Sequence, residues 1–142
     1  LDGAACAETS ALLERVLAVE RRSWKWAAGE SIFQSEPFPA FYRELLQRSG
    51  GLGQLRAAFV RRAGRDIGYA FGSRFGGSFR GHQMGFDEAE RAFAPGNLAQ
   101  ATLIEHLCRE GARSYDLGMA IDYKRRWADR ELRIVNLLGL PR

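Results

Sequence analysis

The stretch that most constrains the fold runs from Ala94 to Trp127, because its hydrophobic pattern changes twice. Pro95-Gly96 interrupts a strand-like run, and apolar residues then recur at helical spacing up to Gly111. These helical positions are Leu98, Ala101, Ile104, Leu107 and Cys108. Residues 112–117 fit a short strand, Gly118 permits a sharp turn, and a short helix is expected after it. The order predicts an α/β sheet in which one helix crosses between two strands.

The start of this helix is a candidate anion site. Asn97 is the expected N-cap, and Gln100 three residues later completes a capping-box pattern. The first N–H groups of a helix form the positive end of its dipole, and proline and glycine keep bulk away from them. We therefore expect Pro95, Gly96, Asn97 and Leu98 to seat a phosphate or pyrophosphate. The alternative is a capped surface helix that binds nothing.

A second chemical feature follows the short strand. Asp116, Tyr123 and Lys124 come just past its carboxyl end. Ligands of open α/β sheets tend to bind beyond the carboxyl ends of strands. The alternative is that residues 123–126 form a solvated basic turn.

These features together resemble a known family. The resembling segments are Phe86-Asp87, Pro95-Gly96, Tyr115-Asp116-Leu117-Gly118 and Tyr123-Lys124 with Trp127; Ser23-Trp24-Lys25 and Phe41-Tyr42-Arg43 also fit. On these residues the chain resembles the acyltransferase-like family associated with cellulose and exopolysaccharide biosynthesis. That family is a branch of the GNAT (Gcn5-related N-acetyltransferase) superfamily and is related to the Fem-type aminoacyl transferases.

The resemblance implies transfer of an acyl group from acyl-CoA, such as acetyl-CoA, to an amine acceptor in polysaccharide or cell-envelope biosynthesis. The helix start at Pro95–Leu98 would hold the pyrophosphate of CoA. Lys124 would stabilise the negative charge that develops during acyl transfer. Tyr123 would donate a proton to the leaving thiolate, and Asp116 would orient Lys124 or accept a proton from the acceptor amine.

Two other functions stay open. Many GNAT members carry a longer glycine-rich phosphate signature, and this chain has only Pro95-Gly96-Asn97 at that point. Fem-type enzymes also lack the full signature and use aminoacyl-tRNA, so tRNA is the one nucleic-acid partner to consider. A catalytically silent GNAT-like module, acting as a scaffold with a second copy or a partner domain, is the other alternative.

The rest of the chain predicts further helices and strands. Helices are expected from Thr9 or Ser10 to Arg22 and from Pro39 to the glycines at 50–53. Antiparallel strands are expected at 54–60, 66–74 and 78–86, followed by an acidic connection at 87–93. A last strand is expected at 132–138. Small residues at Gly68, Ala70 and Gly72 indicate close approach of another layer or a ligand.

We expect one α/β domain over residues 1–142, with a mixed, mainly antiparallel sheet flanked by helices. A GNAT domain normally opens with a strand, but residues 1–8 fit only a loose lead-in, so the opening strand is expected to be missing. The domain is then expected to be a fragment of a longer protein. The exposed sheet edge would be covered by a second copy or by the chain's own terminus.

Bulk properties exclude several protein classes. No apolar run approaches the ~20 residues that span a bilayer. Two cysteines predict free thiols in a reducing compartment, hence a cytoplasmic protein, with Cys6 near a terminus and Cys108 in the core. His82 and His106 lack ligand partners, so they are expected to be structural and no metal is expected. The net charge of +4 suits a phosphate-bearing ligand, while the scattered basic residues are unlike a nucleic-acid binder.

Overall fold

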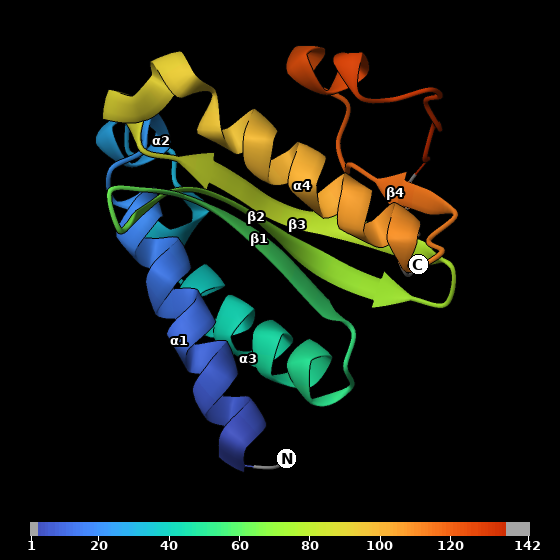
Figure 1. Ribbon diagram of the computed structural model, residues 1–142, viewed down its shortest axis with the longest axis horizontal. Helices are drawn as coiled ribbons and strands as arrows, with labels where there is room; N and C mark the ends of the chain where they lie inside the picture. The colour runs from blue at the N-terminus through green and yellow to red at the C-terminus, as the bar shows by residue number, and fades with distance from the viewer. Residues whose placement is uncertain (1–2, 136–142) are drawn as a thin grey trace, which may run out of the picture.

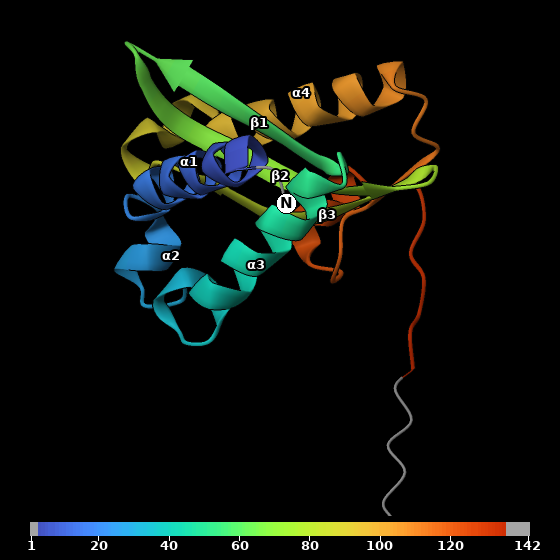
Figure 2. The same ribbon diagram turned by 90° about the horizontal axis from the view of Figure 1, so that it is seen from below.

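The computed structural model of the 142-residue chain describes the backbone of residues 3–135 and the side chains of residues 8–135. A four-stranded sheet forms the middle layer, and helices cover both of its faces (Figures 1 and 2). The helices are α1 (Gly3–Glu20), α2 (Trp24–Ala27), α3 (Phe38–Gly51) and α4 (Pro95–Arg109), with short 3-10 helices η1 (Ile32–Gln34), η2 (Glu88–Phe93) and η3 (Asp122–Arg126). The strands are β1 (Leu55–Arg62), β2 (Arg65–Phe75), β3 (Ser78–Phe86) and β4 (Ser114–Asp116).

The sheet has the strand order β1-β2-β3-β4. β1, β2 and β3 form an antiparallel meander, with tight turns at Ala63-Gly64 and Gly76-Gly77. α4 then crosses one face, so that β4 pairs with β3 in parallel. The expected mixed, mainly antiparallel sheet flanked by helices is therefore confirmed, and within residues 3–135 no strand precedes α1.

The two faces of the sheet carry separate cores. α1 and α3 cover one face, where the buried side chains are Leu13, Val16, Val19, Phe33, Tyr42, Leu46, Tyr69 and Phe71. α4 covers the other, where they are Ala58, Ala70, Phe79, Ala99, Leu103 and Leu107. Alternate residues of β2 thus enter opposite cores, as the two-residue period of a strand requires.

Small residues in β2 allow α4 to approach the sheet closely. A Cβ atom at Gly68 would lie 2.8 Å from the carbonyl carbon and oxygen of Pro95. Ala70, two residues on, is buried in the α4 core. The layer that these small residues admit is a helix, which fixes the start of α4 directly over β2.

Three expectations about the elements are wrong. α1 begins at Gly3 and not at Thr9, because the alanines among residues 4–7 are strong helix formers. Residues 132–135 form no strand: Leu132, Ile134 and Val135 are 73–84% exposed, and an apolar pattern without a partner strand does not make a ladder. Residues 136–138 of that expected strand lie outside the described residues.

The third wrong expectation concerns Cys108, which is exposed and not in the core. The buried stripe of α4 runs through Ala99, Leu103 and Leu107, and Cys108 lies beside it. The side chain of Cys6 lies outside the described side chains.

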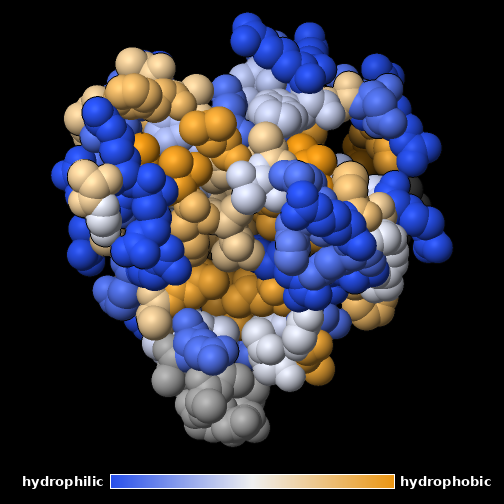
Figure 3. Space-filling view, viewed as in Figure 1, coloured by the Kyte–Doolittle hydropathy of each residue, from blue (hydrophilic) through white to orange (hydrophobic). Residues whose placement is uncertain are grey.

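The molecular surface is mixed in character. On the face shown in Figure 1, apolar side chains gather toward the middle and hydrophilic ones surround them (Figure 3). Along residues 3–135, no helix combines the length and the apolar character needed to cross a bilayer.

Candidate functional site

The start of α4 has the backbone features of an anion site, although not through the expected cap. The helix begins at Pro95, preceded by Ala94 in the left-handed conformation at φ 48°, and no side chain caps it within the described chain. Asn97 is therefore inside the first turn, so its expected N-cap role is wrong. Proline at the first helical position explains the earlier start, because its ring sets a helical φ and it has no N–H to leave unpaired.

The four expected phosphate-seat residues differ in exposure. Pro95 and Gly96 are buried, whereas Asn97 and Leu98 are exposed. The Leu98 N–H already donates to the Ala94 carbonyl at 3.1 Å. The N–H groups of Gly96 and Asn97 are thus the ones that the uncapped helix start offers to an anion.

Ion pairs hold η2, and with it the start of α4. Asp87 is 3% exposed, pairs with Arg22 at 2.6 Å and accepts the Ala89 N–H at 3.1 Å. Glu90 of η2 pairs with Arg62 at 2.6 Å. Asp87, one of the resembling residues, therefore anchors this connection.

The neighbouring strand β3 is paired on one side only over most of its length. β4 pairs with Ser78–Arg80, and in the described chain no strand continues that pairing along residues 81–86. The far end of this free edge lies at α4, since a Cβ atom at Gly96 would be 3.2 Å from the Phe86 ring. A free strand edge and a helix N-terminus therefore meet at one end of the molecule.

A β-bulge re-aims the side chains along this edge. Phe71 pairs with Gln83 and Gly72 with Gly81, so His82 is the extra residue of β3. His82 Nε2 lies 2.9 Å from the Ser73 hydroxyl, and Gln83 donates to the Tyr42 hydroxyl at 2.8 Å. Two successive side chains thus face α1 and α3, forming a polar group beside the free edge.

His82 is suited to accept a proton. Burial, and then the charge of Arg80, lower the pKa of His82 below its ordinary value of 6.5, which keeps the ring neutral near pH 7. Sequence reasoning gave His82 a structural role. The structure agrees with the bulge: Phe79 and Met84 both reach the α4 core although they are five residues apart, an odd spacing that requires an extra residue between them.

The three expected catalytic residues gather around the turn after β4. Asp116 ends β4, accepts the Gly118 N–H at 2.8 Å and pairs with the guanidinium of Arg80. Lys124 in η3 donates to the Leu117 carbonyl at 2.7 Å. Asp116 and Lys124 are thus brought to one turn, but the carboxylate makes its direct ion pair with Arg80.

Burial and neighbouring charges shift the pKa of each of these three groups. Burial, and then Arg80, lower the pKa of Lys124, while the charge of Asp116 opposes this change. Burial raises the pKa of Tyr123, so its hydroxyl keeps its proton near pH 7. Burial also acts to raise the pKa of Asp116, but the Gly118 N–H and Arg80 together lower it.

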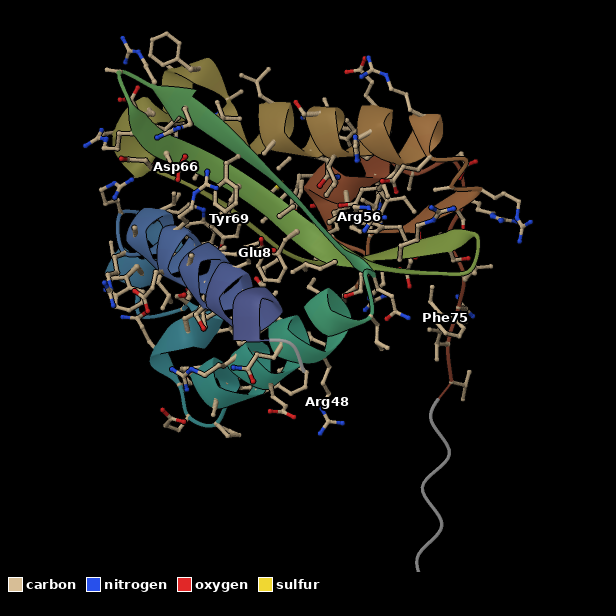
Figure 4. All side chains as sticks on the ribbon, turned by 60° about the horizontal axis from the view of Figure 1, so that its bottom comes forward. Glu8, Arg48, Arg56, Asp66, Tyr69 and Phe75 are labelled. Atoms are coloured by element: carbon tan, nitrogen blue, oxygen red, sulfur yellow. The ribbon has the colours of Figure 1, made fainter. Side chains whose placement is uncertain are left out.

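A buried ion pair ties the helices to the free edge of β3. Glu20 is fully buried and binds the Tyr69 hydroxyl and the Ser31 hydroxyl, each at 2.7 Å. Lys25 lies 3.0 Å from Glu20 and donates to the Met84 carbonyl at 3.1 Å. Tyr69 lies between α1 and the sheet (Figure 4). This cluster holds the strand edge that a ligand would contact. Of its residues, Lys25 alone belongs to a segment that carries the family resemblance.

Two hollows of the described structure lie elsewhere. One of about 300 Å³ lies between α1, the end of α3 and the start of β1, with Glu8 and Arg56 at its rim (Figure 4). The other, of about 120 Å³, lies between α4 and β4 beside Cys108. Neither is lined by Asp116, Tyr123, Lys124 or the start of α4.

Most of the chain matches a known protein family. Residues 3–125 match the family model described as the acetyltransferase (GNAT) domain. The chain belongs to the GNAT family. Comparison of this GNAT domain with curated protein sequences gives no match.

Solved GNAT structures share its fold at low sequence identity. The aminoglycoside acetyltransferase AAC(6')-Iy, in complex with the bisubstrate analogue CoA-S-monomethyl-acetylneamine, is 12% identical, covers 91% of each chain and has a TM-score of 0.62. The PaiA N-acetyltransferase of Thermoplasma acidophilum, in complex with coenzyme A, is 17% identical over 70% of this chain and 68% of its own, with a TM-score of 0.51. At these identities the likeness shows the fold.

Proposed function

We propose that this GNAT domain transfers an acetyl group from acetyl-CoA to an amine. The observation that carries the proposal is that the uncapped start of α4 meets the free edge of β3. The α4 start offers N–H groups to phosphates, and the strand edge offers an extended arm backbone groups that no neighbouring strand pairs. The AAC(6')-Iy and PaiA structures, whose ligands contain CoA, support this choice of donor.

The residues present fit CoA. Gly96 lacks a Cβ that would crowd the Phe86 ring, and the N–H groups of Gly96 and Asn97 would receive the phosphates. From Arg80 to Phe86 the strand edge spans roughly 20 Å at about 3.3 Å per residue. An extended pantetheine arm needs a comparable length. Acetyl-CoA would supply the activated acetyl thioester.

Residues on both sides of the free edge would handle protons and charge. We propose that His82, neutral near pH 7, accepts a proton from the acceptor amine. Tyr123 would donate a proton to the departing sulfur, and Lys124 would hold positive charge near the reacting carbonyl. Asp116 supports the charged form of Lys124 through space and fixes Arg80 directly.

The resemblance to the branch associated with cellulose and exopolysaccharide biosynthesis extends the proposal to the acceptor. We propose an amine on a polysaccharide or cell-envelope precursor. The short phosphate motif fits both the silent-module alternative and aminoacyl-tRNA-dependent transfer.

A thermal-shift series separates these functions. A ligand at 100 times its dissociation constant adds about 2.7 kcal/mol to folding stability. We expect CoA and acetyl-CoA to raise the melting temperature, and acetyl-CoA to release free thiol when an amine acceptor is added. No shift with CoA, acetyl-CoA or longer acyl-CoAs would contradict the proposal and support a silent module. A shift with aminoacyl-tRNA alone would favour the Fem-like alternative.

A further inference from the structure

Gln100 on α4 has a buried side-chain nitrogen without a partner. The residue is 4% exposed, and its Nε2 makes no hydrogen bond within the described part of the chain. Its Oε1 lies 3.5 Å from the Tyr115 hydroxyl. Arg74 Nε is also unpaired, but the Arg74 guanidinium pairs with Glu110 through another nitrogen. A buried amide N–H without an acceptor costs folding free energy, so an acceptor atom from a bound ligand would stabilise the Gln100 nitrogen.

The amide of Gln100 lies where the β3 edge becomes free. Tyr115 belongs to β4 and pairs with Phe79 of β3. The two rings pack edge to face, with 4.8 Å between their centroids. The Tyr115 hydroxyl would be 2.9 Å from a Cβ atom at Gly81, the first β3 residue beyond the pairing with β4. Gln100 is therefore linked, through the Tyr115 hydroxyl, to the inner end of the free edge.

In the structure, Tyr115 contacts the oxygen of this amide and leaves the nitrogen without a partner. Burial raises the pKa of Tyr115 to about 12, so the hydroxyl keeps its proton at neutral pH and donates toward Gln100 Oε1. The amide then presents Nε2, a donor, to a ligand. The matching ligand atom is an acceptor, such as a carbonyl oxygen.

We propose that Gln100 Nε2 donates a hydrogen bond to an amide carbonyl of the pantetheine arm of CoA. This inference rests on the proposed function. Gln100 is four residues from Gly96, about 6 Å along the helix axis. The pantetheine arm carries amide carbonyls in the stretch that follows the phosphates. Gln100 thus binds the pantetheine arm of the acetyl donor, while the start of α4 binds the phosphates.

The test compares two ligands and two variants by titration calorimetry and thermal melting. Gln100→Met keeps the side-chain length and removes the amide, and Thr102→Met places methionine on the exposed side of the same helix as the control. CoA carries the arm, whereas adenosine 3′,5′-bisphosphate lacks it. We expect Gln100→Met to weaken CoA and acetyl-CoA equally, on the order of tenfold for one lost hydrogen bond. Its affinity for adenosine 3′,5′-bisphosphate should equal that of the wild type.

The ligand-free melting temperature gives an independent readout. Because the amide is unpaired without ligand, Gln100→Met should melt at or above the wild-type temperature. Unchanged CoA affinity in Gln100→Met, while the wild type binds CoA, would overturn this inference alone. A loss confined to acetyl-CoA would also overturn it, because the contact would then be to the acyl group. A wild type that binds neither ligand would overturn the proposed function as well. Should Gln100→Met fail to fold, Gln100→Leu answers the same question.

Discussion

At the scale of single residues, His82 illustrates how an extra residue in a strand can place a proton-accepting side chain beside a binding edge. Without the bulge, His82 and Gln83 would lie on opposite faces of the sheet. With it, both face α1 and α3, and burial keeps the imidazole neutral. The irregular strand thus presents a base beside the edge where we propose the donor binds.

His82 gives a pH prediction with a defined sign. Its pKa is lowered in the folded protein, so protonation disfavours the folded state, and stability should fall as the pH drops below 6.5. Transfer activity should fall over the same acidic range. His82→Gln should remove this acidic limb and reduce turnover by about 100-fold or more. The exposed His106→Gln is the control, and an unchanged pH–rate profile in His82→Gln would contradict the assignment.

Lys124 allows a test of charge without a change in length. Lys124→Met should lower turnover by on the order of 100- to 1000-fold, because one well-placed electrostatic group is lost. Its melting temperature should change little, since the side chain is partly exposed and makes one hydrogen bond, to Leu117. Arg125→Met, on the exposed neighbour, is the control. Full activity in Lys124→Met would assign the lysine to the solvated surface.

At the scale of elements, periodicity predicted what is local and missed what depends on neighbours. The meander and α4 follow from two-residue and helical spacing, and residues 78–86 were predicted with the bounds that β3 has. The start of α4 was placed three residues late, because Asn97 is a good cap in isolation while Pro95 packs on Gly68. Tertiary packing, which one sequence does not reveal, decided that boundary.

The α4 start yields a prediction that separates charge from bulk. Gly96→Asp adds a carboxylate beside the proposed phosphates, so CoA and adenosine 3′,5′-bisphosphate should both bind at least about tenfold more weakly. Gly96→Ala adds only a Cβ, 3.2 Å from the Phe86 ring, and should lose less. Titration calorimetry on both folded variants measures the difference. Equal affinity for CoA in Gly96→Asp and the wild type would contradict the proposal that the start of α4 binds the phosphates.

At the scale of the whole molecule, the site joins segments that sequence order keeps apart. The α4 start and the turn after β4 were visible as local patterns or as parts of the resemblance, whereas the β3 bulge was not predicted. Their meeting along one free edge depends on where the parallel pairing stops, at Arg80 and Asp116. Pairing length is a property of the assembled sheet, so Gln100 and Glu20, which gain their settings only there, were not predicted as site residues.

The other edge of the sheet carries the last prediction. β1 pairs only with β2, so within residues 3–135 its outer backbone groups have no strand partner. Such an edge recruits another strand unless it is covered. We therefore expect the 142-residue chain to self-associate along β1, unless its own terminus covers the edge. Light scattering should then give a mass that rises with concentration, and the β1 amides should exchange more slowly at high concentration. The central strand β2 is the internal control, protected throughout. A monomer at every concentration, with rapidly exchanging β1 amides, would show that this edge stays open.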